Sequence, residues 1–194
     1  MHRGRHRAPP ARRRLRDAAC PFAATSAQFD CRFRPDRKRQ VVLRSLDPTF
    51  VAQAGTPTLV GPPGLGKTIL AIGVATKQVQ LGHTARFVTA QALAAQLGRT
   101  GTVVGRQRLL KSLLTCDVLV LDERGPLPTA PAFGPALYAV IAGRYERRPT
   151  IRTANKGVTA WASIVQDVSL AAALVDRLMH HDQVFYSPST TRSL

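Results

Sequence analysis

Short apolar runs alternate with longer stretches of helical periodicity along most of the chain. Runs rich in Val, Leu, Ile and Phe predict strands, and they lie at residues 58–60, 85–89, 117–121, 150–153 and 183–186. Apolar residues spaced three and four apart predict helices at residues 66–80, 91–97, 106–115, 131–147 and 169–180. We expect Gly98, Gly101 and Gly105 to interrupt the helical pattern between the second and third of these helices.

Strands separated by helices are typical of βαβ units, in which helical crossovers join parallel strands. Residues 118–121 are all apolar, as expected of a strand buried on both faces of such a sheet. We therefore expect an α/β fold over residues 25–194, with a parallel five-stranded sheet flanked by helices. The stretch after the last predicted strand is short and weakly patterned, so no C-terminal lid domain is expected.

Positive charge dominates the composition: 28 Lys and Arg residues oppose 11 Asp and Glu residues in 194, a formal net charge of +17. Residues 1–24 are rich in Arg and Pro, and we expect them to form a basic, disordered N-terminal segment. Residues 40–194 still carry 16 basic against 8 acidic residues, so the excess is not confined to that segment. DNA is the natural partner of such a chain, although Arg-rich tails also occur simply as solvated segments.

Apolar runs and cysteines bear on where the protein resides. No apolar run is long enough to span a bilayer, so no membrane association is expected. The three cysteines, Cys20, Cys31 and Cys116, form no C-x-x-C pair and cannot all pair with one another. They are interpreted as reduced thiols of a cytoplasmic protein, with no zinc site.

A phosphate-binding loop is the most specific motif. Residues 61–68 read G-P-P-G-L-G-K-T and match G-x-x-x-x-G-K-[ST] at every position, between a predicted strand and a predicted helix. Backbone N–H groups and the helix N-terminus would surround the phosphates of ATP, Lys67 would reach the β- and γ-phosphates, and Thr68 would ligate Mg²⁺. A chance Gly/Pro turn is the alternative. The predicted ATP-binding residues are Gly61, Pro62, Pro63, Gly64, Leu65, Gly66, Lys67 and Thr68.

Two adjacent acids, Asp122 and Glu123, end the strongest predicted strand. Ligands of parallel sheets bind beyond the carboxyl ends of the strands, which would place Asp122 beside Thr68 at the Mg²⁺ ion. Glu123 would then polarise an attacking water, which points to ATP hydrolysis. The alternative is an acidic pair that only caps the next loop.

The motifs together resemble the IstB-like ATP-binding proteins, helper ATPases of a bacterial insertion-sequence transposition system. These proteins are related to the DnaC helicase loader and belong to the AAA+ superfamily. The resemblance runs from about Arg13 to the C-terminus and rests on the phosphate loop and on three further stretches. They are L-D-E-R-G-P-L-P at 121–128, T-A-N-K at 153–156 followed by Trp161, and L-A-A-A-L-V-D-R-L-M-H-H at 170–181. Pro126 stands where the family has Tyr.

The resemblance implies further roles. Asn155 matches the polar sensor residue that helps the catalytic glutamate orient water, although an Asn after a strand is commonly a turn residue. Arg177 matches the arginine finger that enters a neighbouring subunit's site, which implies a homo-oligomer with shared ATP sites. Its alternative is a favourable cation near a helix C-terminus. Trp161 is expected to be a packing anchor rather than a base-stacking platform.

Two basic clusters are candidates for DNA contact. The region after the second strand can face DNA in AAA+ relatives, and it carries Arg99, Arg106, Arg108 and Lys111. The second cluster, Arg144, Arg147 and Arg148, either contacts phosphate or is a solvated face.

The expected function is an ATP-dependent, DNA-binding helper ATPase that assembles on double-stranded DNA and regulates a transposase. Three alternatives stay open. A helicase loader of the DnaC kind would prefer single-stranded DNA, and a truncated copy would bind DNA without turnover. A small-molecule P-loop kinase would need an acceptor site and a lid, and the sequence shows neither.

Overall fold

A computed structural model of the protein describes residues 43–155, 157, 159–165, 167–179 and 183–185. The basic segment predicted at 1–24 lies outside the described residues, as do the start of the domain predicted from 25 and the stretch from 186 to 194. Within the described part of the chain, no helix is both long and apolar enough to cross a membrane.

The centre of the fold is a parallel sheet of five strands in the order β2-β3-β4-β1-β5. The strands are β1 (Thr58–Val60), β2 (Ala85–Thr89), β3 (Val118–Asp122), β4 (Thr150–Ala154) and β5 (Gln183–Phe185). The predicted parallel α/β arrangement is confirmed. Only the bounds differ by a residue or so, because strand ends are weakly encoded by local pattern.

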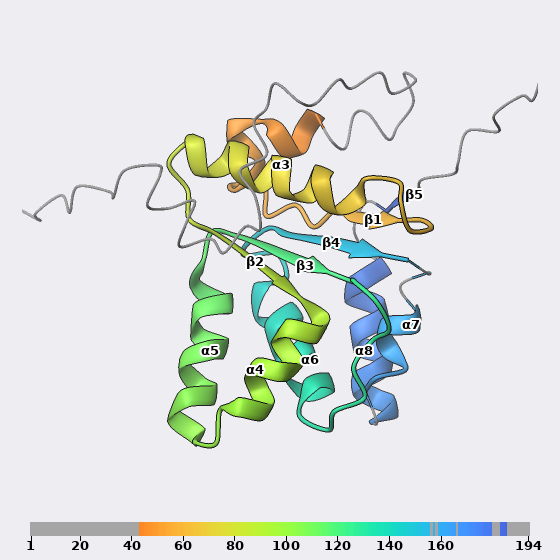
Figure 1. Cartoon of the computed structure of the whole chain (residues 1–194). Coiled ribbons are helices and arrows are strands. Elements are labelled where there is room, and N and C mark those ends of the chain that lie inside the picture. Colours follow the sequence, from red (N-terminus) through yellow and green to blue (C-terminus); the bar gives the residue numbers. More distant parts are fainter. Residues whose placement is uncertain (1–42, 156, 158, 166, 180–182, 186–194) are drawn as a thin grey trace, which may run out of the picture.

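Alternate residues of β3 explain how both faces of the sheet become covered. Val118 and Val120 pack on the side of helix α3 (Lys67–Gln80), together with the side chain of Phe50. Leu119 and Leu121 point to the other side, since successive strand side chains alternate between faces. Figure 1 shows α3 above the sheet and the remaining long helices below it.

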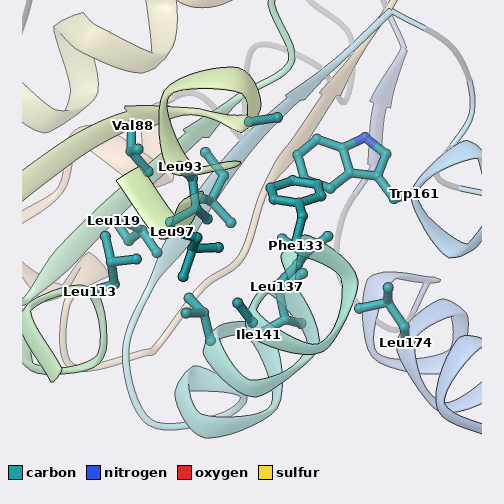
Figure 2. Packing of buried hydrophobic residues seen from close by; sticks show 14 of the residues in the cluster. Val88, Leu93, Leu97, Leu113, Leu119, Phe133, Leu137, Ile141, Trp161 and Leu174 are labelled. Atoms are coloured by element: carbon teal, nitrogen blue, oxygen red, sulfur yellow. The ribbon is translucent and has the colours of Figure 1, made fainter. Parts of the chain in front are cut away.

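Five helices cover the second face of the sheet (Figure 1). They are α4 (Ala90–Arg99), α5 (Val103–Thr115), α6 (Phe133–Arg144), α7 (Thr159–Ala162) and α8 (Val168–Met179). Their apolar side chains form one cluster with the sheet, and Figure 2 shows Phe133, Leu137, Trp161 and Leu174 within it. α7 is a short helix that the periodicity did not predict, because four residues are too few to show a helical repeat.

The expected glycine breaks are wrong at two of three positions. Gly98 lies inside α4 and Gly105 lies inside α5, so only Gly101 falls between the helices. α5 begins at Val103 because the Thr102 hydroxyl accepts a hydrogen bond from the Gly105 N–H at 3.1 Å and caps the helix. An N-cap threonine thus overrides the poor helix propensity of glycine in the first turn.

Arg144, one of the three residues of the second basic cluster, does not lie on the surface. Its side chain is fully buried. Its guanidinium donates to the carbonyl oxygens of Leu113 at 2.8 Å, Cys116 at 2.7 Å and Pro149 at 2.6 Å. Arg144 therefore joins the end of α5 to the starts of β3 and β4 and presents no charge to DNA.

Candidate active site

The loop at 61–68 lies between β1 and α3, as predicted. Gly64 has φ +87° and Gly66 has φ +75°, both in the left-handed region that side chains rarely adopt. A Cβ at either position would meet no atom within 4 Å, so the backbone conformation is what requires glycine there. Gly66 also caps α3 without a side-chain hydrogen bond, which leaves the first N–H groups of the helix directed toward the loop. Together these features are typical of a cradle for phosphate oxygens.

Lys67 is buried in this loop and is 5% exposed. Its ammonium donates to the main-chain oxygens of Gly61 at 2.6 Å and Pro62 at 2.8 Å. Burial lowers the pKa of Lys67, and the charges of Asp122 and Glu123 oppose that shift. The lysine thus lies near both acids at the end of β3, as the sequence predicts.

Asp122 is fully buried and is the meeting point of two hydroxyl groups. Thr68 Oγ1 donates to Asp122 Oδ1 at 2.7 Å, and Thr153 Oγ1 donates to the same oxygen at 2.5 Å. The other carboxylate oxygen, Oδ2, is buried without a hydrogen bond among the described residues, and the Nε of Arg124 is 4.0 Å from it. A buried, unsatisfied carboxylate oxygen beside a threonine hydroxyl fits a Mg²⁺ ion, which prefers oxygen ligands.

Strand register explains why these residues meet. Asp122 pairs with Thr153 across β3 and β4, and Val60 pairs with Ala154 across β1 and β4. The phosphate loop and both acids therefore lie at the same carboxyl edge of the sheet. Thr153 is the site residue that motif reasoning missed, although its position one residue before the strand end placed it beside Asp122.

Glu123 follows Asp122 but is held by a different set of partners. Its N–H contacts Thr153, at 3.2 Å from the carbonyl oxygen and 3.0 Å from the hydroxyl. Its carboxylate oxygen Oε2 accepts a hydrogen bond from the indole Nε1 of Trp161 at 2.9 Å. Asn155, the predicted sensor, donates through Nδ2 to the main-chain oxygen of Glu123 at 3.2 Å. All three partners thus converge on the residue expected to activate water.

Comparison with protein-family models shows which family the chain belongs to. Residues 3–189 match the family model described as IstB-like ATP binding protein. The chain belongs to the IstB-like ATP-binding family. This confirms the resemblance identified from the motifs.

Curated relatives of this IstB-like chain come from insertion sequences. A protein of insertion sequence IS21 from Pseudomonas aeruginosa, named as ATP-binding, is 38% identical over 168 residues. A similarly named protein of IS5376 from Geobacillus stearothermophilus is 35% identical over 165 residues. These alignments cover 87% and 85% of this chain but 63% and 66% of the relatives, so the chain spans less than two thirds of their length.

Two solved structures have a fold similar to that of the chain. The crystal structure of DnaI matches with a TM-score of 0.68 and 20% identity, covering 92% of this chain and 95% of that one. The DnaC helicase loader matches with a TM-score of 0.62 and 22% identity, covering 84% and 98%. The IstB-like chain therefore shares the α/β fold of these two proteins.

Arg177 lies far from the phosphate loop of its own chain. It lines a small cavity with Thr56, Thr150 and Arg152, at the edge of the sheet where β1 and β4 begin. Its guanidinium carbon is 5.7 Å and 5.8 Å from the ring centroids of Tyr138 and Tyr145. The five residues of β4 separate this edge from the carboxyl edge by about 13 Å. The structure does not bring Arg177 together with Lys67 and Glu123.

The basic residues predicted to contact DNA are all exposed on the α4–α5 hairpin. Arg99 ends α4, whereas Arg106, Arg108 and Lys111 belong to α5. Arg108 and Lys111 are three residues apart and share one side of the helix, but Arg106 lies about 160° around the axis from Arg108. Cys116 is buried and unpaired, and the described residues contain no cluster of three metal-binding side chains.

Proposed function

We propose that this chain is an ATP-dependent, DNA-binding helper ATPase of transposition. The observation that carries the proposal is the convergence of the buried Lys67, the Thr68–Asp122 contact and Glu123 at the carboxyl edge of the sheet. Membership of a family of ATP-binding proteins, and the insertion-sequence context of the relatives, support it.

The role proposed for each site residue follows from its chemistry and its burial. Residues 61–66 bind phosphate through backbone N–H groups, and Lys67 moves from the loop carbonyls to the β- and γ-phosphates. Thr68 and Asp122 hold Mg²⁺, which when bound neutralises charge that develops on the phosphates. Glu123 accepts a proton from the attacking water, and Asn155 keeps the main chain of Glu123 in place by its 3.2 Å hydrogen bond.

DNA binding is proposed to use the exposed cations of the α4–α5 hairpin, with double-stranded DNA as the preferred form. Arg99, Arg106, Arg108 and Lys111 supply charge that phosphate contacts require, and the chain as a whole is strongly basic. A transposase is the proposed protein partner, because the relatives are named as proteins of insertion sequences.

ATP hydrolysis by the purified protein, measured without DNA, with duplex DNA and with single-stranded DNA, tests the proposal. We expect turnover that duplex DNA stimulates. Glu123→Gln should still bind ATP but lose hydrolysis by roughly a hundredfold or more, because a general base contributes about that much. Glu146→Gln changes the only other glutamate, which is exposed, and should retain full turnover.

Two of the alternatives have their own signature in this experiment. Stimulation by single strands alone would favour a helicase loader, and ATP binding without turnover under every condition would favour a non-catalytic copy. Full hydrolysis by Glu123→Gln would remove Glu123 from the mechanism.

A further inference from the structure

We propose that Trp161 is a positioning residue for the carboxylate of Glu123. The inference rests on the proposed ATPase function and assigns Trp161 a role beyond core packing. Its indole N–H donates to Glu123 Oε2 at 2.9 Å, and the two residues are 2% and 9% exposed. A hydrogen bond between two buried groups at the catalytic edge is shielded from competition by water.

Packing fixes the direction of the indole N–H. Trp161 belongs to the apolar cluster that also contains Phe133, Leu174 and Leu178, all buried. Figure 2 shows the indole within this cluster, beside the ring of Phe133. A large planar ring that is 2% exposed in a packed cluster cannot change rotamer without displacing its neighbours. The indole N–H of Trp161 is therefore oriented toward Glu123 before a nucleotide binds.

The hydrogen bonds that fix the main chain of Glu123 do not fix its carboxylate, so the carboxylate needs a partner of its own. Thr153 and Asn155 fix the main chain on either side of the residue. The carboxylate is three rotatable bonds further out, and the hydrogen bond from Trp161 restrains one of its oxygens.

Other charges face Glu123 as well. Lys67 of α3 interacts with it, Asp122 of β3 precedes it, and Arg124 follows it. Trp161→Phe alters none of these three residues, so a change in kcat would report the loss of the indole donor.

Trp161→Phe keeps an aromatic ring and removes the donor. We expect kcat to fall roughly tenfold to a hundredfold, with little change in KM for ATP. Phe133→Leu is the matched control, because it also perturbs this cluster but removes no polar group. It should lower stability and leave kcat close to that of the wild type.

Intrinsic fluorescence gives a second readout that needs no turnover. Trp161 is the only tryptophan of the chain, so tryptophan emission reports its surroundings directly. Glu123→Gln keeps an oxygen acceptor but removes the negative charge beside the indole nitrogen. Excitation takes electron density away from that nitrogen, so the negative charge of Glu123 stabilises the excited state. Emission should move to shorter wavelength in Glu123→Gln and stay unchanged in Glu146→Gln.

The kinetic and the fluorescence measurements together distinguish failure of the positioning role from failure of the ATPase function. If wild type hydrolyses ATP while Trp161→Phe keeps its kcat, the positioning role is overturned and the ATPase function stands. Unchanged emission in Glu123→Gln would also overturn it, even if Trp161→Phe fails to fold. Absence of turnover in wild type overturns the proposed ATPase function and the catalytic role of Trp161 together, while an emission shift would still establish the contact.

Discussion

At the residue scale, two neighbouring acids have different surroundings. Asp122 is fully buried and accepts hydrogen bonds from the hydroxyls of Thr68 and Thr153. The carboxylate of Glu123 instead meets the indole of Trp161. Side chains of successive strand residues point to opposite faces, so adjacent acids at a strand end separate into different environments. This is why one acid suits a cation and the other a water molecule.

Thr153→Val tests the support of Asp122. It removes the hydroxyl that donates to Asp122 and accepts from the Glu123 N–H, and it keeps the shape of the side chain. We expect the free energy of unfolding to fall by about 1–2 kcal/mol, and Mg²⁺-dependent ATP binding to weaken as well. Urea unfolding and nucleotide titration with and without Mg²⁺ measure the two effects.

Thr76→Val is the control for that substitution. The Thr76 hydroxyl is buried without a hydrogen bond among the described residues, so valine there should be neutral or stabilising. Equal destabilisation by the two variants would contradict the role given to Thr153.

At the element scale, one buried arginine ties three elements together. Arg144 ends α6, and its guanidinium reaches the carbonyl oxygens of residues that end α5 and precede β3 and β4. Burial lowers the pKa of Arg144, and Cys116 and Asp117 oppose that shift. The Pro149 carbonyl oxygen also accepts a backbone hydrogen bond from Leu119, and the arginine adds donors where these elements end or begin.

Arg144→Leu should therefore be strongly destabilising. It removes the buried hydrogen bonds of the guanidinium to the carbonyl oxygens of Leu113, Cys116 and Pro149, and we expect a loss of roughly 3 kcal/mol or more in the free energy of unfolding. Arg147→Leu removes an exposed arginine three residues later and should change it by no more than about 0.5 kcal/mol. Chemical denaturation compares the two, and similar midpoints would show that Arg144 has no such structural role.

At the scale of the whole molecule, the two ends of the sheet carry different parts of the proposed machinery. The phosphate loop and both acids occupy the carboxyl edge, whereas Arg177 lies at the opposite edge against Tyr138 and Tyr145. In the proposed mechanism, Arg177 would therefore act on a nucleotide bound by a neighbouring copy. Head-to-tail contacts between copies would bring the two edges together.

Mixing two inactive variants tests that arrangement. Arg177→Ala and Glu123→Gln should each lose hydrolysis alone. In an equal mixture, roughly a quarter of head-to-tail interfaces combine an intact Glu123 with an intact Arg177, so partial turnover should return. ATPase assays of the separate and mixed proteins measure it. No recovery, in preparations shown to exchange subunits, would argue against shared sites.

The sequence by itself determined the parallel α/β fold, the phosphate loop and the order of the site residues along the chain. Glycines at fixed spacing, an apolar strand and terminal acids are local features, and local features can be read from a pattern. The start of α5 escaped prediction, because the Thr102 cap outweighed the glycine signal.

Only the tertiary structure decided which distant residues meet. Thr153 and Trp161 are 31 and 38 positions from the acids that they contact, and strand register and helix packing bring them there. The same packing took Arg144 out of the basic surface and placed Arg177 at the far edge of the sheet. Such contacts depend on how elements are stacked, and residue types along the chain do not encode that stacking locally.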